Sequence, residues 1–595
     1  MLPWLAIGIL AAQEMEFRWE LPSDRAADYA VSDWKGGRAV PRKDRFFLVY
    51  GAELSKDGGN SLIVNGYGDI GPKFLFRLPP GKVKVGAKWK VEETLFLDAR
   101  LALAPSHDLD ERRVMGECQF QKIEKVKDLD CAVVAGRFEL WEVKFEKDKR
   151  VLGKKAIAWL STMQWISLQE TILVRGVWTL SGDGQEFRGI KQGEEARKTK
   201  VNYAEHLELK PGRIELEMKA HAEPVKKSIQ RGVAWLRTRQ KQNGSFVDEG
   251  GSFARDFPVG TTALCLMALL HSGVKPDDPS IRRGFAYVAG QPFQKTYDVS
   301  TALMLFETKY LPLEQVDDVQ SLDESRAKEA IRRSITAADR AFVQKAADWL
   351  LEKQTRGGTW GYPDFAEYFD HSNTQYALLG LKSAARMGVP IRAETWKRIA
   401  EHWMSCQRLT GGKKAPLRLE FYSDADAGVE KTKADEEFET GAWGYFTAKP
   451  PAFGVEVHDQ GYGSMTCAGL TSLIIAESEL AAAKELDDGL RRRIGTAKRQ
   501  GLAWLQQHWS IRGCPPSAGF WSVFYPYYLY SLERVGVLYG IRKFDGHDWY
   551  LEGAVLLVRS QREDGSWSSY DEIPVLDTAF SLLFLKKATI RVATK

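Results

Sequence analysis

Cysteine is scarce in this sequence, and no block of basic residues occurs in it. Six cysteines among 595 residues are too few for a disulfide scaffold, and no CxxC, HExxH or Cys/His cluster has the spacing of zinc ligands. The 84 lysines and arginines face 79 aspartates and glutamates, a balance that does not suit a nucleic-acid-binding surface. The sequence therefore predicts no metal site, no cofactor and no nucleic-acid partner. Pairing of Cys118 with Cys131 is left open by the sequence, since these residues flank two neighbouring predicted strands.

Long apolar runs are also missing after the first residues of the chain. The run Leu2–Ala12 is uncharged, ends in small residues and has the length of the apolar part of a secretory signal, although it lacks a basic start. We interpret residues 1–13 as a signal peptide, and a buried N-terminal strand is the alternative. No other stretch has the 18 to 20 continuous apolar residues of a membrane span. An exported protein without an integral membrane segment, periplasmic or extracellular, is the expectation.

Residues 14–220 show the period-two alternation of β-strands. Apolar and polar residues alternate in short runs that are separated by glycine and aspartate turns, which is typical of an antiparallel sheet or an open barrel. The charged stretch 193–202 is expected to be an exposed loop, and the strand pattern stops near Pro224. This region offers no catalytic cluster and predicts a structural or docking module. The expected strands are 45–54, 60–68, 73–79, 88–103, 117–126, 131–149, 172–182 and 212–222.

Residues 225–590 change to the helical period of 3.6 and contain an internal repeat. Six amphipathic helices alternate with six that are apolar on all sides, and a helix apolar all round must be enclosed. The sequence thus predicts an α+β multidomain protein, in which an antiparallel β domain precedes an (α/α)6 toroid. The amphipathic segments are 228–246, 281–293, 343–362, 398–412, 496–510 and 550–567, and the apolar ones are 259–273, 298–310, 372–388, 461–478, 520–536 and 576–588.

Several amphipathic segments end in a glutamine followed by a glycine and an aromatic residue. Gln354, Gly358 and Trp360 form one such set, Gln561, Gly565 and Trp567 form another, and Gln240, Gly244 and Phe246 are a variant. These sets resemble the QW-type repeat of squalene and oxidosqualene cyclases, within the prenyltransferase and squalene-oxidase repeat superfamily. The resemblance implies the (α/α)6 toroid, with isoprenoids or peptides bound at its mouth.

The repeat also has a physical interpretation in its own right. Glycine permits the positive φ of a tight turn, and the glutamine amide is expected to bond the free end of a neighbouring helix. The 19 tryptophans of the chain are then mainly a repeated packing device. Four of them are expected to pack between helices: Trp235, Trp349, Trp504 and Trp567.

The catalytic motifs of the resembled enzymes are absent. Class II terpene cyclases protonate their substrate with an Asp-x-Asp-Asp motif, and the nearest string here, residues 424–427, lacks its last aspartate. Protein prenyltransferases hold zinc with Asp, Cys and His, but no Asp-x-Cys pair accompanies Cys467. Both activities are therefore disfavoured in their usual form.

A set of carboxylates and histidines falls at the starts of the apolar helices. A carboxylate at a helix start is favoured as a cap and by the helix dipole, so capping is one interpretation. The other is a cluster of general acids or bases at one mouth of the toroid. The catalytic candidates are Asp298, Asp370, His371, His458, Asp459 and Asp577, and Asp256 occupies a similar position. The candidates for ligand binding are Tyr376, Tyr462, Tyr525 and Tyr528, and the tyrosine-rich segment with Phe524, Tyr527 and Tyr530 would either line or fill the cavity.

Three functions remain open from the sequence. The first is an exported protein that binds a lipid, glycan or peptide without converting it. The second is a divergent terpenoid-cyclase-like enzyme that uses a carboxylic acid at the cavity mouth. The third is a polysaccharide-active enzyme with paired carboxylates. The long polar inserts 311–337 and 410–461 are expected to cap the toroid or form a binding lip.

Overall fold

The structure is a computed structural model, and its chain divides into two compact units between Ala220 and His221. The first unit is a β-sheet and the second is mainly helical, which confirms the predicted α+β class. The described residues are 17–18, 25–35, 38–50, 82–97, 110–126, 129–146, 149–168, 173–186, 197–209, 214–215, 218–247, 256–313, 322–362, 369–423, 428–429, 436–445, 461–511, 513–515, 525–568 and 573–592.

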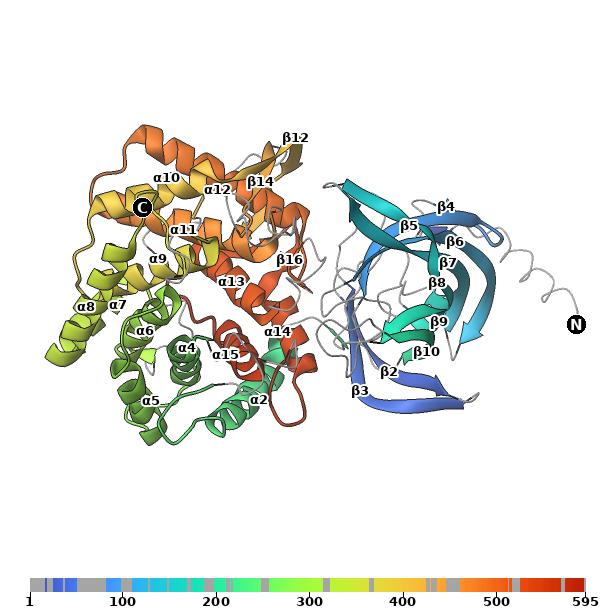
Figure 1. Cartoon of the computed structure of the whole chain (residues 1–595), viewed down its shortest axis with the longest axis horizontal. Helices are drawn as coiled ribbons and strands as arrows, with labels where there is room; N and C mark the ends of the chain where they lie inside the picture. The colour runs from blue at the N-terminus through green and yellow to red at the C-terminus, as the bar shows by residue number, and fades with distance from the viewer. Residues whose placement is uncertain are drawn as a thin grey trace, which may run out of the picture. The chain divides into compact units, whose positions relative to one another are not determined.

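The first unit is built on a nine-stranded antiparallel sheet, strongly curved in Figure 1. Its strands follow the order β11-β2-β10-β9-β8-β7-β6-β5, with β3 paired to β2. Alternate residues such as Val114, Phe138 and Leu160 are buried, which is the pattern of a sheet with one covered face. The strands are β2 (Arg25–Lys35), β3 (Arg38–Tyr50), β5 (Lys88–Leu97), β6 (Asp110–Val126), β7 (Leu129–Glu146), β8 (Lys149–Ser167), β9 (Leu173–Glu186), β10 (Arg197–Leu209) and β11 (Ile214–Glu215); β1 (Phe17–Arg18) pairs with β4 (Lys82–Val83).

Several details of this sheet differ from the prediction. Strand β8 was missed, since its lysines and glycine interrupt the alternation, and β10 occupies part of the expected loop 193–202. The Cys118–Cys131 pairing that the sequence left open is not formed, because both cysteines are free and buried. In the register of β6 and β7, Cys118 lies opposite Gly136 while Cys131 lies opposite Glu124. The two cysteines are thus six positions apart along the ladder, about 20 Å at 3.3–3.4 Å per residue. The expected strands 60–68 and 73–79 lie outside the described residues.

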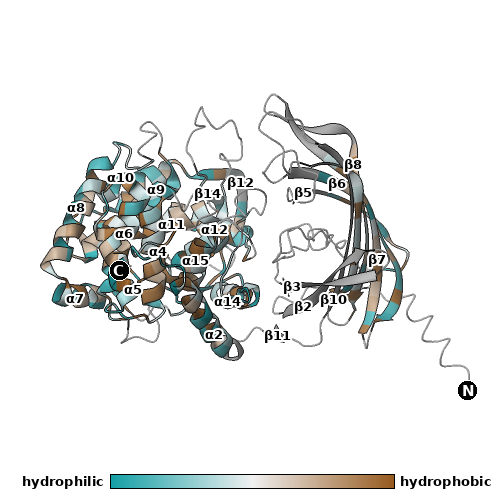
Figure 2. Cartoon of the chain, turned by 60° about the horizontal axis from the view of Figure 1, so that its bottom comes forward, coloured by the Kyte–Doolittle hydropathy of each residue, from teal (hydrophilic) through white to brown (hydrophobic). Residues whose placement is uncertain are grey.

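Six apolar helices of the second unit contact one another in a closed order. Each contacts the next in the sequence α4, α6, α9, α11, α13, α15, and α15 contacts α4. Nearly every residue of α4 and α15 is buried, and both helices are mainly apolar in Figure 2. The six inner helices are α4 (Pro258–His271), α6 (Thr296–Lys309), α9 (His371–Arg386), α11 (Gly463–Ala482), α13 (Tyr525–Leu538) and α15 (Pro574–Leu585).

A second set of helices packs outside this ring (Figure 1). Most of them bury one stripe against the inner helices, as the amphipathic pattern predicted, whereas α14 is buried on all sides over residues 549–557. The outer helices are α2 (Met218–Arg237), α5 (Pro279–Ala289), α8 (Ala337–Lys353), α10 (Ala393–Ser405), α12 (Asp488–Gln507) and α14 (Trp549–Ser560).

One boundary was predicted incorrectly, and both long inserts contain elements that the sequence analysis did not predict. Helix α2 begins at Met218 and runs through Pro224, so the expected strand 212–222 is wrong in its second half. The insert 311–337 contains α7 (Glu324–Ser334), a helix whose polar composition hid its period. The insert 410–461 contributes to short strands: β12 (Arg408–Pro416), β13 (Leu419–Phe421) and β14 (Glu437–Ala442), with β13 paired to β15 (Ile541–Phe544), which also pairs with β16 (His547–Asp548). That the inserts cap the toroid or form a binding lip stays a prediction.

Helix α11 is long and apolar enough, by length and composition, to cross a membrane. Most of its apolar window, 78%, is buried inside the unit, where it contacts α9 and α13. Its composition is thus accounted for by its place as a core helix of the ring.

Candidate functional site

The turns that follow the outer helices hold the starts of the inner helices in place. The indole N–H of Trp360 donates to the carbonyl of Leu350, and that of Trp567 donates to Leu557, at 2.8 and 2.7 Å. The backbone N–H of Trp360 donates to the hydroxyl of Thr374, in the first turn of α9. The same bond to a threonine recurs between Phe246 and Thr262, Trp443 and Thr466, and Trp567 and Thr578. These four threonines were missed, although each stands at a fixed place in an apolar helix.

The glycine of the repeat has the conformation expected from its sequence position. Gly358 has a φ of 82°, and a Cβ placed there would lie 2.6 Å from the carbonyl oxygen of Arg398. The positive φ is therefore confirmed, and the close approach to the next outer helix is a second reason for glycine. Gly244 and Gly565 also have positive φ values.

The glutamine of the repeat behaves differently from the expectation. Gln561 donates through its amide to the carbonyls of Gly565 and Ser228, and its own carbonyl accepts from the Ser228 hydroxyl. Ser228 lies in the body of α2 and not at a free helix end. The amide therefore ties the turn to the side of the neighbouring helix.

Asp370 caps the start of α9 and is fully enclosed. Its carboxylate accepts hydrogen bonds from the backbone N–H and the side-chain amide of Asn373, both at 2.8 Å. Burial is the main cause that raises the pKa of Asp370 to about 6. The capping interpretation is thus realised, and the carboxyl group is harder to ionise than an exposed one.

Asp298, in the first turn of α6, stabilises a neighbouring helix. Its carboxylate accepts from the backbone N–H of Gly260 at 2.7 Å, which belongs to the first turn of α4. Burial raises the pKa of Asp298 to about 6, against the lowering effect of the Gly260 N–H. This carboxylate therefore joins two inner helices at their starts.

The other acidic candidates differ in their surroundings. Asp577 lies in the first turn of α15 and is 1% exposed, whereas Asp256 is exposed at the surface before α4. His458 and Asp459 lie outside the described residues, as does the string 424–427. Three of the predicted carboxylates, Asp298, Asp370 and Asp577, are thus buried at the starts of inner helices.

Aromatic side chains from several inner helices meet inside the ring. The rings of Tyr297 and Tyr376 lie 4.5 Å apart, and those of Tyr376 and Tyr527 lie 6.4 Å apart. Phe580 of α15 contacts Tyr527 and Tyr530 of α13 at 5.6 and 5.9 Å. At this level, side chains of α6, α9, α13 and α15 fill the space between the helices. Phe524 lies outside the described residues.

The hydroxyls of two predicted ligand-binding tyrosines bond to the chain itself. Tyr528 donates to the carbonyl of Ser510 at 2.8 Å and Tyr525 donates to that of Ile511 at 2.5 Å. Tyr462 is buried immediately before α11, where its backbone carbonyl accepts from Thr466. These contacts fix the loop before α13 and the start of α11, and ligand contact by these tyrosines stays a prediction.

Arg534 is a buried arginine that the sequence analysis overlooked. Its side chain is 1% exposed on α13, and its guanidinium lies 4.1 Å from the ring centre of Tyr530 and 5.6 Å from that of Tyr376. None of its three nitrogens meets hydrogen-bond geometry with a partner among the residues that the structure describes. The sequence did contain a signal for this residue, namely a charge within a predicted apolar helix, because arginine is rarely fully buried unless it is paired.

Charged residues also meet at the other ends of the inner helices. The Lys382 amine of α9 bonds to Glu324 of α7, at 2.6 Å, and to Glu479 of α11. Arg386 of α9 donates to Glu307 of α6 at 3.0 Å. This network pairs charges of four helices, so it serves the fold, and Arg534 of α13 takes no part in it.

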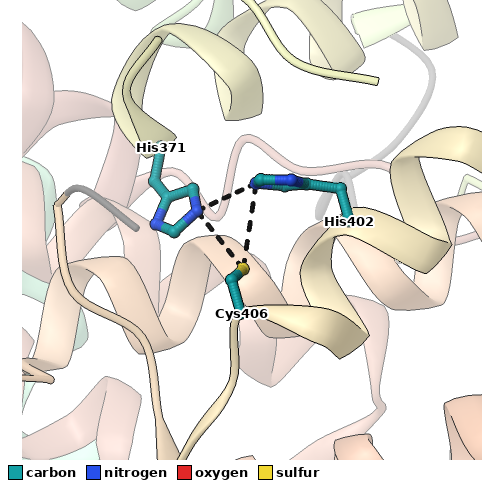
Figure 3. A group of neighbouring side chains, drawn as sticks. All are labelled: His371, His402 and Cys406. Carbon is teal, nitrogen blue, oxygen red and sulfur yellow. Dashed lines mark hydrogen bonds between the residues drawn. The ribbon is translucent and has the colours of Figure 1, made fainter. Parts of the chain in front are cut away.

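A histidine of the predicted set takes part in a cluster that the sequence did not reveal. His371, the first residue of α9, faces His402 and Cys406 from the end of α10 (Figure 3). The Nε2 atoms of the two histidines are 3.0 Å apart, and the Cys406 sulfur lies 3.4 Å from His371 Nε2 and 3.8 Å from His402 Nε2. Burial is the main cause that lowers the pKa of His371 to about 3 and of His402 to about 4, so both imidazoles are neutral near pH 7. The cysteine that the sequence analysis considered for a zinc site was Cys467, which lies within α11 and outside this cluster.

No family model matches this chain, and no curated protein matches its sequence. Among solved structures it is similar to those of type II terpene cyclase MstE from Scytonema. One variant of that cyclase in complex with its substrate, geranylgeranyl dihydroxybenzoate, and another in complex with its product, merosterolic acid A, are each 12% identical to this chain, with a TM-score of 0.33. Both comparisons cover 62% of this chain and 99% of the cyclase chain.

Proposed function

We propose that the helical unit is an (α/α)6 toroid that binds an amphipathic acid, with an apolar body and one carboxylate or phosphate group. The single observation that supports this proposal is Arg534, a buried cation without a hydrogen-bond partner among the described residues. A buried charge is costly unless it is paired, so this site favours a ligand that supplies the missing anion. Among the three classes of ligand expected from the sequence, the proposal selects a lipid.

The surroundings of Arg534 suit the rest of such a ligand. Tyr376, Tyr530 and Phe580 offer apolar ring faces close to the guanidinium. These rings pack against one another, so the bound ligand would replace some of their mutual contacts. Tyr527 is half-buried and marks the side of the aromatic cluster that solvent reaches. Export of the protein stays a prediction from its first residues.

A comparison of matched ligands tests this proposal. A long-chain fatty acid and the alcohol of the same chain length are titrated into the full-length protein by calorimetry. The acid should bind at least tenfold more tightly, because a charge-assisted hydrogen bond contributes about 1.5–3 kcal/mol. Arg534→Met should remove this preference, and Arg239→Met, which removes an exposed arginine over Trp235, should keep it. Equal binding of acid and alcohol by the unaltered protein would refute the proposal.

A divergent terpenoid-cyclase-like activity is the second candidate. The observation in its favour is that Asp298, Asp370 and Asp577 are buried carboxyl groups at one end of the inner helices. A lipid extract incubated with the protein should then yield a cyclised product, which mass spectrometry and chromatography would detect, and Asp577→Asn should abolish it. The polysaccharide hypothesis gains no comparable support, because Asp298 and Asp370 both bond to helix starts.

A further inference from the structure

We propose that His371, His402 and Cys406 form a zinc site at the start of inner helix α9. The proposal is independent of the ligand bound in the ring, since its evidence lies between α9 and α10. Zinc prefers imidazole nitrogen and thiolate sulfur as ligands, and these three side chains offer two of the first and one of the second. Their donor atoms all lie within 4.8 Å of one another.

The distances between the donor atoms fit one tetrahedral ion. Zn–N bonds of about 2.0–2.1 Å and Zn–S bonds of about 2.3 Å place two nitrogens about 3.3 Å apart and a nitrogen and a sulfur about 3.6 Å apart. The observed N···N distance is 3.0 Å and the N···S distances are 3.4 and 3.8 Å. Shifts of about 0.3 Å would convert the cluster into a zinc site of standard geometry.

The second shell holds His371 in the tautomer that a metal requires. Its Nδ1 lies 2.6 Å from the carbonyl oxygen of Gly444, so Nδ1 carries the proton and donates it there. The lone pair of Nε2 then points toward His402 and Cys406, as Figure 3 shows. A histidine that donates its other ring N–H to a carbonyl is typical of metal sites. The imidazole also stacks on Trp403 at 4.4 Å, which fixes the plane of the ring.

The other two ligands come from one rigid element. His402 and Cys406 are four residues apart at the end of α10, so their side chains share one face of the helix. Trp443, from the turn after β14, donates through its indole to the Trp403 carbonyl and ties this helix end to the Gly444 segment. The protein thus positions all three donor atoms before any ion binds, which reduces the cost of binding.

The site has room in its coordination sphere and a nearby positive charge. Three protein ligands leave a fourth tetrahedral position, as in zinc sites that also bind water. His402 and Cys406 are half-buried, whereas His371 is buried. Burial raises the pKa of the Cys406 thiol to about 12, and the nearby charge of Arg408 acts in the opposite direction. On binding, the Cys406 thiol loses its proton to solvent and the sulfur–zinc bond forms, so one proton is released per zinc ion.

Metal titration of the full-length protein tests the site. The apoprotein is prepared with a chelator and titrated with Zn²⁺, and in parallel with Co²⁺, whose bond to thiolate gives a charge-transfer band. We expect one equivalent to bind, with a cobalt–thiolate band and with thermal stabilisation that increases with metal concentration. Cys406→Ser should abolish the band, and His402→Gln should weaken zinc binding by at least tenfold.

The controls separate a lost ligand from a lost fold. Cys467→Ser alters a buried cysteine outside the cluster and should keep both the equivalent of zinc and the band. Circular dichroism should show unchanged helix content in the folded variants. The proposal is overturned if the folded, unaltered protein binds no zinc, which would leave a hydrogen-bonded His–His–Cys group. It is also overturned if zinc still binds to Cys406→Ser and His402→Gln with unaltered affinity.

Discussion

At the scale of single residues, this protein combines buried ionisable groups that have partners with a few that do not. Asp370 and Asp298 accept hydrogen bonds from helix starts, and burial still raises the pKa of each to about 6. The desolvation of the charged form therefore outweighs the hydrogen bonds that favour it. Arg534 has aromatic faces but no hydrogen-bond partner among the described residues. These contrasts distinguish the structural carboxylates from Arg534, the residue on which the proposed ligand site rests.

Asp298 makes the stability of the helical unit depend on pH. Its pKa is about 6 in the folded chain and 3.8 ordinarily, so the folded state binds more protons between these values. The stability from this group is present below pH 3.8 and is lost as the pH rises through 6, by at most about 3 kcal/mol. Asp298→Asn keeps an oxygen that can accept from Gly260. We expect the variant to lose this decline, so that its free energy of unfolding in urea exceeds that of the unaltered protein at pH 8.

An exposed aspartate supplies the control for this prediction. Asp545 has a side chain 47% exposed, and Asp545→Asn should leave the pH dependence of unfolding unchanged. If Asp298→Asn unfolds with the same pH dependence as the unaltered protein, the Asp298 carboxylate is ionised without cost, and its burial does not have the assigned effect.

At the scale of helices and strands, the elements predicted most accurately from the sequence are those that belong to the repeat. The six apolar helices were identified because their residues are apolar on all sides, and all six are described as inner helices. Helix α7 and strand β8 were missed, since charged residues obscure their periods. Predicted boundaries also failed at Pro224, where proline was taken to mark a stop and α2 continues through it.

The candidate site could be predicted only in part, for a physical reason. Helix-start carboxylates such as Asp370 show in the sequence because a cap has a fixed position along the helix. The His371–His402–Cys406 cluster does not, because its members come from two helices and 31 to 35 residues separate them. Only the i,i+4 spacing of His402 and Cys406 was visible, and two ligands alone do not define a metal site.

The turn glycine of the repeat gives a test at the level of the element. Gly358 has a φ of 82° and approaches Arg398, whereas Gly273 has a φ of 92° and open space around its Cα. Gly273→Ala should therefore cost about 1–2 kcal/mol of stability, from the backbone conformation alone. Gly358→Ala should cost more, because the Arg398 carbonyl must also move. Chemical unfolding of both variants measures the difference between their free energies of unfolding. Equal losses of stability would show that the close approach of Gly358 to Arg398 does not contribute to it.

At the scale of the whole helical unit, a closed ring needs contacts that join each inner helix to the next. At the helix starts, Asp298 joins α6 to α4, and the threonines of the repeat join each turn to an inner helix. At the opposite ends, Lys382 joins α9 to α7 and α11, and Arg386 joins α9 to α6. Hydrogen bonds and ion pairs therefore stabilise both ends of the ring, and aromatic side chains pack against one another between the two ends.

The Lys382 network provides the test of this arrangement. Lys382→Met keeps most of the side-chain volume but leaves the carboxylates of Glu324 and Glu479 without their shared amine. Loss of one partner of a buried ion pair costs about 3–5 kcal/mol, and Lys328 and Arg386, which remain near Glu324, favour the lower end of that range. Arg332→Met removes an ion pair of a side chain that is 71% exposed and should change stability by less than about 0.5 kcal/mol.

A second change in the Lys382→Met variant, Glu479→Gln, should restore part of the lost stability, since it removes one of the unpaired carboxylate charges. Urea unfolding of the four proteins decides the matter: equal losses in Lys382→Met and Arg332→Met, without rescue, would mean that the ring does not depend on this network.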